Sequence, residues 1–148
     1  MFRARPVLLL MSVLVGACAS HSRVAGEYRL VALNGMSLPA RVQGDTCQPR
    51  VQAGSLTLGS DARWRGVLIG QDPCRASIDT SWYAGRYSTD GSALSLQVDS
   101  FTWGGRPSIS GEASDTLLGT ASGSTLTVRY SGKDLAGGPQ VFSLRRVP

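Results

Sequence analysis

Apolar and polar residues alternate along short stretches of this chain, from residue 26 almost to the C-terminus. Gly26–Leu33, Ser55–Leu58 and Trp64–Ile69 are the first three such stretches. Alternation with a period of two places the apolar side chains on one face of a β-strand. The further stretches are Ile78–Tyr83, Gly85–Ser88, Ala93–Val98, Thr116–Thr120, Thr125–Tyr130 and Val141–Arg145. No window has the apolar period of a helix of about ten residues or more, so the pattern predicts an all-β protein.

Turn signals separate these stretches. Asn34-Gly35 is the strongest short hairpin signal. Thr89-Asp90-Gly91 and Ser122-Gly123-Ser124 also predict tight turns, and Ala84-Gly85 predicts a kink between two strands. Regularly spaced short strands joined by tight turns are typical of a β-barrel or a β-sandwich.

An internal repeat favours the barrel. Ala25-Gly-Glu-Tyr28 recurs as Ala84-Gly-Arg-Tyr87, and the segments Gly54–Leu58, Gly91–Leu96 and Gly123–Val128 share one pattern of glycine, small polar residues and alternating apolar positions. Repeated hairpin units suit a meander, in which strands adjacent in sequence pair in space. We therefore expect a single antiparallel up-and-down barrel of about eight strands, which removes its edges by closing. An open, strongly bent sheet and convergent low complexity remain the alternatives.

The N-terminus has the pattern of a secretory signal. Arg3 and Arg5 precede the apolar run Val7–Val15, which small residues and Cys18 follow. The run is much shorter than the roughly 20 residues of a membrane-spanning helix. Val15-Gly-Ala-Cys18 resembles the lipobox of bacterial lipoproteins.

That resemblance implies cleavage before Cys18, a diacylglyceryl group on its thiol, and acylation of its new amino terminus. The expected organisation is a signal peptide over 1–17, a lipidated cysteine and tether over 18–24, and a β-barrel domain over 25–148. Ala19 stands where an aspartate would imply retention at the inner membrane, so we expect anchoring at the periplasmic face of the outer membrane. The alternative is an ordinary signal peptide with cleavage near Ala17 or Ala19.

The net charge argues against nucleic acid as a partner, and the cysteine content predicts a disulfide. Loss of Arg3 and Arg5 with the signal peptide lowers the formal net charge from +5 to +3, too little to predict nucleic-acid binding. With Cys18 assigned to lipid, Cys47 and Cys74 form an even pair in an oxidising compartment, which predicts a disulfide. The alternative is a redox or metal pair, but the chain has neither Cys-x-x-Cys nor a histidine near these cysteines.

The strand and turn residues resemble those of small bacterial lipocalin-like domains. The resemblance lies in Gly26-x-Tyr28-x-Leu30, Asn34-Gly35 and Leu38-Pro39, then Gly85-x-Tyr87, Asp90-Gly91, Leu94-x-Leu96, Gly119-Thr120, Gly123-x-x-Leu126 and Phe142-x-Leu144-Arg145. It covers residues 25–146 and implies a small barrel; classical lipocalins, similar in form, bind apolar molecules inside the cup. Ala40–Ala53, the cysteine pair and Phe101–Ser110 depart from the pattern. The META/heat-shock family and small-barrel protease inhibitors are weaker resemblances.

Catalytic chemistry has few candidates. The only histidine, His21, lies in the expected tether, so no Ser-His or Cys-His dyad is available. Lys133 lies in an expected turn, and the carboxylates are scattered among turns without the spacing of a glycosidase pair or a calcium loop. We expect no enzyme, no metal and no cofactor.

Aromatic residues give better candidates for binding. Phe101-Thr-Trp103-Gly-Gly-Arg106-Pro107 has the pattern of an exposed loop or rim, in which Trp103 and Arg106 can contact a ligand, a partner or lipid headgroups. With Trp82, these residues form the predicted contact set; the alternative is a loop that folds back into the barrel.

Two functions follow. The first is a monomeric, outer-membrane-anchored periplasmic lipoprotein whose lipocalin-like barrel binds a small apolar or envelope-derived ligand. The second is an interaction, inhibitor or envelope-stress module with a filled barrel, acting on an envelope protein through its loops. The short strands slightly favour the filled barrel.

Overall fold

The computed structural model describes residues 23–43, 47–103, 106–108, 115–131 and 138–148. Its strands are β1 (Gly26–Leu33), β2 (Met36–Ser37), β3 (Ala40–Arg41), β4 (Arg50–Leu58), β5 (Arg63–Asp72), β6 (Ser77–Asp90), β7 (Ala93–Trp103), β8 (Arg106–Ser108), β9 (Thr116–Ser122), β10 (Thr125–Tyr130) and β11 (Gln140–Arg146). Among the described residues, no helix has the length and apolar character needed to cross a membrane.

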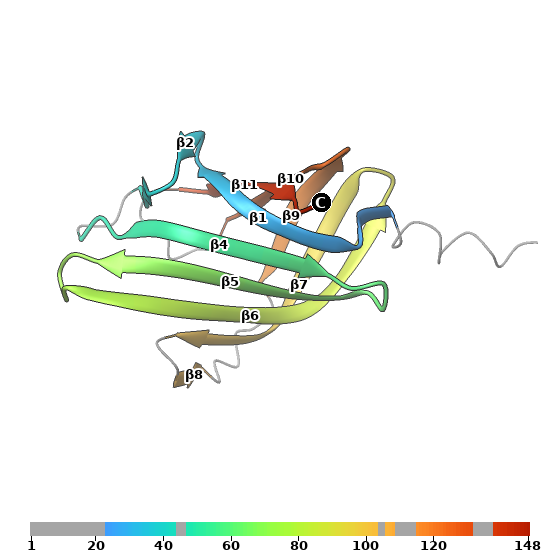
Figure 1. Cartoon of the computed structure of the whole chain (residues 1–148). Coiled ribbons are helices and arrows are strands. Elements are labelled where there is room, and N and C mark those ends of the chain that lie inside the picture. The colour runs from blue at the N-terminus through green and yellow to red at the C-terminus, as the bar shows by residue number, and fades with distance from the viewer. Residues whose placement is uncertain (1–22, 44–46, 104–105, 109–114, 132–137) are drawn as a thin grey trace, which may run out of the picture.

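Eight of these strands close into an antiparallel barrel (Figure 1). The order around the barrel is β1-β4-β5-β6-β7-β9-β10-β11, and β1 pairs with both β4 and β11. Gly26 lies opposite Leu58 of β4, and Tyr28 lies opposite Arg146 of β11. This confirms the predicted up-and-down barrel of eight strands and decides against an open sheet.

The strands match the alternating stretches, with two corrections. β6 is one strand through Ala84-Gly85, so the predicted division into two strands is wrong, although the register of its pairing with β7 does shift between Ala84 and Gly85. The irregularity lies in the partner strand β7, where the register shifts between Val98 and Ser100. The part of the predicted loop that begins at Phe101 is also strand, because β7 continues to Trp103 and pairs with β8.

The predicted hairpin at Asn34-Gly35 is confirmed. Both residues have positive φ, 51° and 78°, as a tight two-residue turn between β1 and β2 requires. The Asn34 side chain fixes the turn to β11, since its amide donates to Gln140 Oε1 at 2.6 Å and its oxygen accepts from the Val141 N–H at 2.7 Å. The buried Gln140 side chain thus gains a hydrogen-bond partner.

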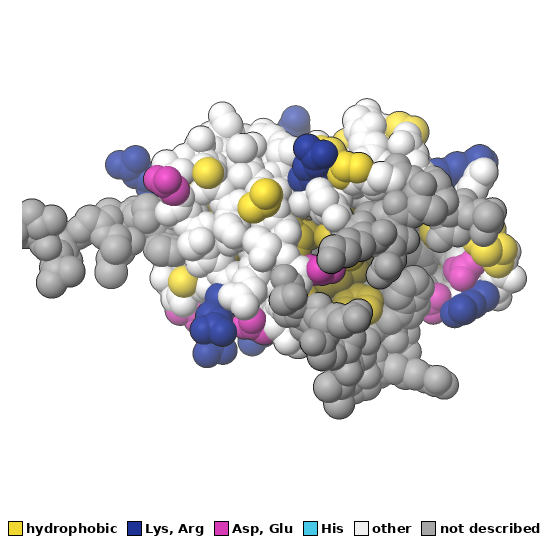
Figure 2. All heavy atoms as spheres, turned by 180° about the vertical axis from the view of Figure 1, so that it is seen from behind, with side chains coloured by type: hydrophobic (Ala, Val, Ile, Leu, Met, Phe, Trp, Pro, Cys, Tyr) yellow, Lys and Arg dark blue, Asp and Glu magenta, His cyan; other side chains and the backbone are white. Residues whose placement is uncertain are grey.

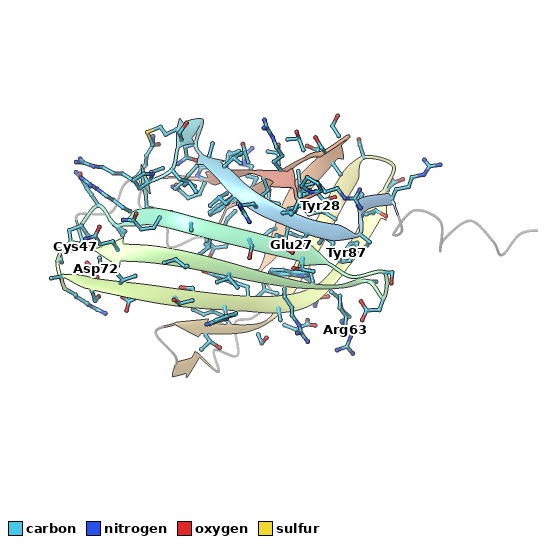
Figure 3. All side chains as sticks on the ribbon, in the orientation of Figure 1. Glu27, Tyr28, Cys47, Arg63, Asp72 and Tyr87 are labelled. Carbon is cyan, nitrogen blue, oxygen red and sulfur yellow. A yellow bond between two sulfur atoms is a disulfide. The ribbon has the colours of Figure 1, made fainter. Side chains whose placement is uncertain are left out.

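The barrel has two unlike ends (Figures 1 and 3). The short β4–β5, β6–β7 and β9–β10 turns and the chain entering at Val24 lie at one end, called here the closed end. The β5–β6 connection, which is as long as the β4–β5 turn, and the longer β3–β4, β7–β9 and β10–β11 connections lie at the other end, the open end. Figure 3 shows Tyr28 and Tyr87 near the closed end, and Cys47 and Asp72 at the open end.

Side chains cover the closed end. The Tyr28 hydroxyl donates to the Val24 carbonyl at 2.7 Å, and the Arg146 guanidinium lies over the Tyr28 ring at 5.9 Å. The Tyr87 hydroxyl donates to the carbonyl of Gly59 at 2.6 Å. Val24, expected in the tether, is buried in the core. The interior is therefore covered at this end by aromatic side chains and fixed backbone.

The apolar core extends along the barrel, with the fully buried Leu33 and the buried Val51 toward the open end. Its most deeply buried side chains include Tyr28, Leu58, Leu96 and Leu126. The barrel strands, the disulfide and the buried core residues all lie between Val24 and Arg146. The chain from Ala19 onward therefore contains the elements that close the barrel, and it is the form used in the experiments below.

Candidate functional site

Strand pairing arranges the inner face of β4–β7 in rows that cross the barrel wall. Nearest the open end, Gly70 of β5 lies between Val51 of β4 and Asp79 of β6. The following rows, in order toward the closed end, are Gly54–Leu68–Ser81, Leu56–Gly66–Tyr83–Phe101 and Leu58–Trp64–Gly85–Val98. We call Leu68, Gly70, Asp79, Ser81, Tyr83 and Phe101 the mouth.

The row below the mouth is densely packed. Trp64 is buried, and its indole lies against the positions of Gly66 and Gly85. A Cβ at Gly85 would lie 1.8 Å from the Gln97 carbonyl oxygen and 2.9 Å from Trp64 Nε1. Trp64 therefore forms a floor beneath the mouth. A Cβ at Gly85 would collide with strand β7, and one at Gly66 would lie 3.2 Å from the Trp64 ring, a tight contact.

Packing within the mouth is uneven, since a Cβ at Gly54 would lie 2.8 Å from Leu68 Cδ2 while Gly70 has more room. Among the described residues, a Cβ at Gly70 would meet only the Arg50 carbonyl oxygen, at 3.6 Å, which is ordinary contact. Leu68, Tyr83 and Phe101 face inward yet are only partly buried. Inward-facing apolar side chains that keep solvent-accessible surface are the surface that an apolar ligand covers.

An aromatic pair forms the inner wall of the mouth. The Tyr83 and Phe101 rings lie opposite each other on β6 and β7, with centroids 4.9 Å apart and planes tilted by 33°. Burial raises the pKa of the Tyr83 hydroxyl above 10.0, and a hydrogen bond with the Ser81 side chain partly opposes this shift. Tyr83 is therefore neutral at physiological pH and presents an apolar ring with a hydroxyl at its edge.

Asp79 brings a carboxylate into the outermost row. Its Oδ2 accepts a hydrogen bond from the Ser77 hydroxyl at 3.1 Å. In the described part of the chain, Asp61, Asp72 and Asp99 each pair with an arginine, whereas Asp79 has no such partner.

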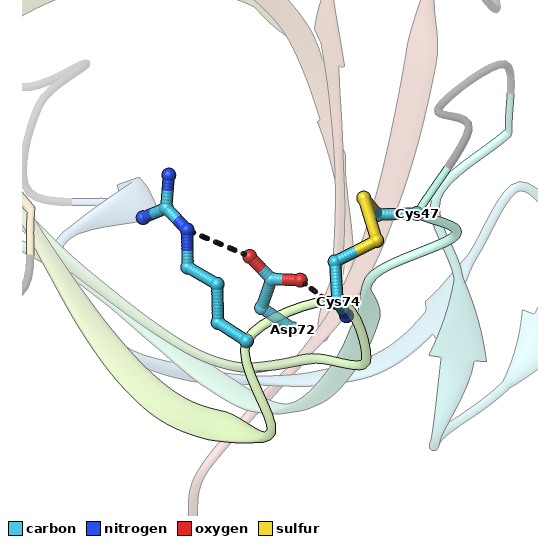
Figure 4. Close-up of a disulfide and its surroundings, with 4 residues drawn as sticks. Cys47, Asp72 and Cys74 are labelled. Atoms are coloured by element: carbon cyan, nitrogen blue, oxygen red, sulfur yellow. Dashed lines mark hydrogen bonds and ion pairs between the residues drawn. A yellow bond between two sulfur atoms is a disulfide. The ribbon is translucent and has the colours of Figure 1, made fainter.

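The disulfide predicted between Cys47 and Cys74 is present and lies at the open end (Figure 4). The sulfurs are 2.09 Å apart, and the bond links the β3–β4 connection to the β5–β6 connection. Asp72 holds the second connection, since its Oδ1 accepts from the Cys74 N–H at 2.9 Å and its Oδ2 pairs with Arg75 at 3.6 Å. The two sulfurs and Asp72 lie close enough to hold a metal, but bonded sulfurs are not thiolate ligands.

The structure separates the residues of the predicted contact set. Trp82 projects from the outer face of β6 and is 54% exposed, whereas Phe101 faces inward beside Tyr83. The backbone of Trp103 pairs with Ser81 and with Arg106, but the side chains of Trp103 and Arg106 lie outside the described residues. Cys18 also lies outside them.

Sequence reasoning missed Gly70, Asp79 and Tyr83 as members of one site. The alternation of β6 carried the signal, because every second residue from Asp79 to Tyr87 faces inward while Trp82 faces outward. The structure shows which face of β6 is the inner one, because it places Tyr87 in the core.

Basic and acidic side chains of the described residues lie interspersed on the face shown in Figure 2, without a broad area of one sign. No protein-family model matches this chain, and no curated protein does so either. The mouth therefore carries the functional argument.

Proposed function

We propose that this protein is a lipid-anchored, lipocalin-like barrel of the periplasm that binds a small apolar or envelope-derived molecule in its mouth. The observation that carries the proposal is the partly exposed inner face around Gly70, set above the floor made by Trp64. Eight-stranded barrels are wide enough either to fill with their own side chains or to hold one small ligand. Among the described glycines of the inner face, Gly70 at the open end has room for a side chain, whereas Gly66 and Gly85 lie against Trp64.

The proposed anchor is compatible with ligand entry. The chain enters the barrel at the closed end, where Val24 packs against Tyr28. A lipid on Cys18 would therefore hold the closed end toward the outer membrane and direct the mouth into the periplasm. Two or three acyl chains make such anchoring effectively permanent.

A substitution at Gly70 tests ligand binding without disturbing the core. The probe is 1-decanol, a neutral apolar molecule, titrated calorimetrically into residues 19–148 below its solubility limit. Gly70→Leu places a side chain in the open space of the mouth and should weaken binding at least about tenfold, by removing most of the buried ligand surface. Thr80→Leu, on the outer face of the neighbouring strand, is the matched control and should bind as the wild type does.

Absence of decanol binding to the wild-type protein would overturn the proposal. If Gly70→Leu bound decanol as tightly as the wild type, the ligand would not lie in the mouth, and this result would also contradict the proposal.

The outer face of β6 supports a second candidate function, that of an interaction module. Trp82 and Ile78 are 54% and 71% exposed on this face, and Trp82 lies opposite Val67 of β5. Exposed large apolar side chains on one face of a strand are a candidate surface for protein contacts. Trp82→Ala should leave decanol binding unchanged, and a loss of decanol binding in that variant would place the ligand on the outer face instead.

A further inference from the structure

We propose that Asp79 makes the mouth selective for ligands that carry a protonated amine at one end of an apolar chain. This inference rests on the proposed function and names the chemical class of its ligand.

The position of Asp79 is fixed by the pairing of β5 and β6. The register between these strands is continuous from Arg63↔Arg86 to Asp72↔Ser77, so the inward face of β6 holds Asp79, Ser81 and Tyr83. The inward placement of Tyr87, a core residue of the same strand, establishes which face this is. Asp79 therefore lies on the interior side of the barrel wall.

Gly70 leaves space beside that carboxylate. Gly70 lies directly opposite Asp79, and no described residue comes closer than 3.6 Å to the position that a Cβ of Gly70 would take. Directly opposed residues in an antiparallel pair have Cβ positions about 5 Å apart. A ligand group placed over Gly70 would thus lie within hydrogen-bonding reach of Asp79.

The surroundings of the Asp79 carboxylate favour a cationic ligand group. Its carboxylate is half-buried, and within the described chain its hydrogen bond comes from the Ser77 hydroxyl, with no arginine or lysine in an ion pair. A carboxylate turned away from bulk water loses hydration, which a cationic partner restores. A protonated amine supplies both the charge and up to three hydrogen-bond donors.

The rest of the inner face accommodates the chain of such a ligand. Polarity falls from the open end inward, from Asp79 through Ser81 to the Tyr83–Phe101 pair. Alternate residues on a strand are about 6.7 Å apart, so Asp79 and Tyr83 are separated by about 13 Å along the wall. An amine at Asp79 would direct its alkyl chain toward the aromatic pair and the Trp64 floor.

The test compares three probes that share one alkyl chain: decylamine, 1-decanol and decanoate. Each is titrated calorimetrically at pH 7 into residues 19–148, below its critical micelle concentration or solubility limit. A charge-assisted hydrogen bond should make decylamine bind about tenfold or more tightly than decanol, with decanoate the weakest.

Asp79→Asn is the variant of interest, and Asp90→Asn is its matched control. Asp90 lies on the same strand at the closed end and is exposed, so its substitution changes the net charge equally without touching the mouth. Asp79→Asn should remove the preference for decylamine while leaving decanol affinity unchanged. Asp90→Asn should keep the preference.

The outcomes separate this inference from the proposed function. Equal binding of decylamine and decanol, or a preference that survives Asp79→Asn, would overturn the amine selectivity and leave the apolar mouth intact. If Asp90→Asn also lost the preference for decylamine, the preference would come from the net charge of the protein and not from Asp79. That result would overturn the inference as well. Failure of all three probes to bind would overturn the proposed function itself.

Discussion

The indole N–H of Trp64 donates to the carbonyl oxygen of Gln97 at 2.9 Å, across the inner face of Gly85. Gly85 lies between these residues on β6 and pairs with Trp64 on one side and Val98 on the other. Any side chain at this position would occupy the place of the hydrogen bond. This contact fixes the floor of the mouth.

Gly85→Ala should therefore destabilise the barrel. Its Cβ would lie 1.8 Å from the Gln97 carbonyl oxygen, so strand β7 or Trp64 must move. Overpacking of this kind costs about 1–3 kcal/mol, measurable as a lower midpoint in urea. Gly70→Ala is the control, because its Cβ makes an ordinary contact of 3.6 Å with the Arg50 carbonyl oxygen, and its midpoint should stay near that of the wild type. Equal midpoints for the two variants would contradict the difference in packing between floor and mouth.

The disulfide should contribute to stability without determining the fold. Cys47 and Cys74 are 27 residues apart, and closing a loop of that length stabilises by about 3.5 kcal/mol in the chain-entropy model. Replacing both cysteines by serine should lower the melting temperature while the far-ultraviolet circular dichroism spectrum stays that of a β-barrel. Thiol labelling of the unreduced wild-type protein at both positions would show that the bond does not form.

Alkaline pH should destabilise the protein through Tyr83. Burial raises its folded pKa above the unfolded value of 10.0, so the folded state holds the phenol proton more tightly. The resulting stabilisation is complete below pH 10.0 and is lost as the pH rises through the folded pKa. Tyr83→Phe should reduce the fall in urea stability between pH 9 and about 11, measured beside the wild type. Tyr87, whose pKa burial also raises, remains in both proteins and accounts for the residual fall.

Lipidation predicts a simple change in localisation. Cys18→Ser removes the only thiol of the lipobox-like segment, so the variant should leave the outer-membrane fraction and appear as a soluble or unprocessed form. The measurement is fractionation of bacterial cells that express the full chain. If the variant stayed in the membrane fraction, the proposed lipid anchor on Cys18 would be contradicted, and the β-barrel fold would be unaffected by that result.

The fold could be predicted from the sequence because its signals are local. The Asn34-Gly35 turn and the alternation from Gly26 to Leu30 depend on neighbouring residues, and the structure confirms both; beyond Leu30 the register shifts, so that Leu33 is buried instead of Ala32. An irregularity is present at Ala84-Gly85, but it is a register shift against β7 and does not divide β6. Residue spacing cannot show that Gly85 is small because Gln97 and Trp64 pack against it.

The mouth was harder to predict, since it depends on which face of each strand is inner. Trp82 and Tyr83 are adjacent in sequence and point to opposite sides of the wall. An aromatic residue was therefore a weak guide to contact with a ligand. The space beside Asp79 comes from a glycine on the next strand, and only the register of β5 and β6 places the two together.

Native mass spectrometry of residues 19–148 purified from a bacterial periplasm tests the central claim most directly, with organic extraction of any bound molecule. We predict a discrete added mass that matches an apolar or envelope-derived molecule, and its loss in Gly70→Leu. A protein that carries no added mass, and that stays unchanged after exposure to envelope lipids, would contradict a ligand-binding mouth.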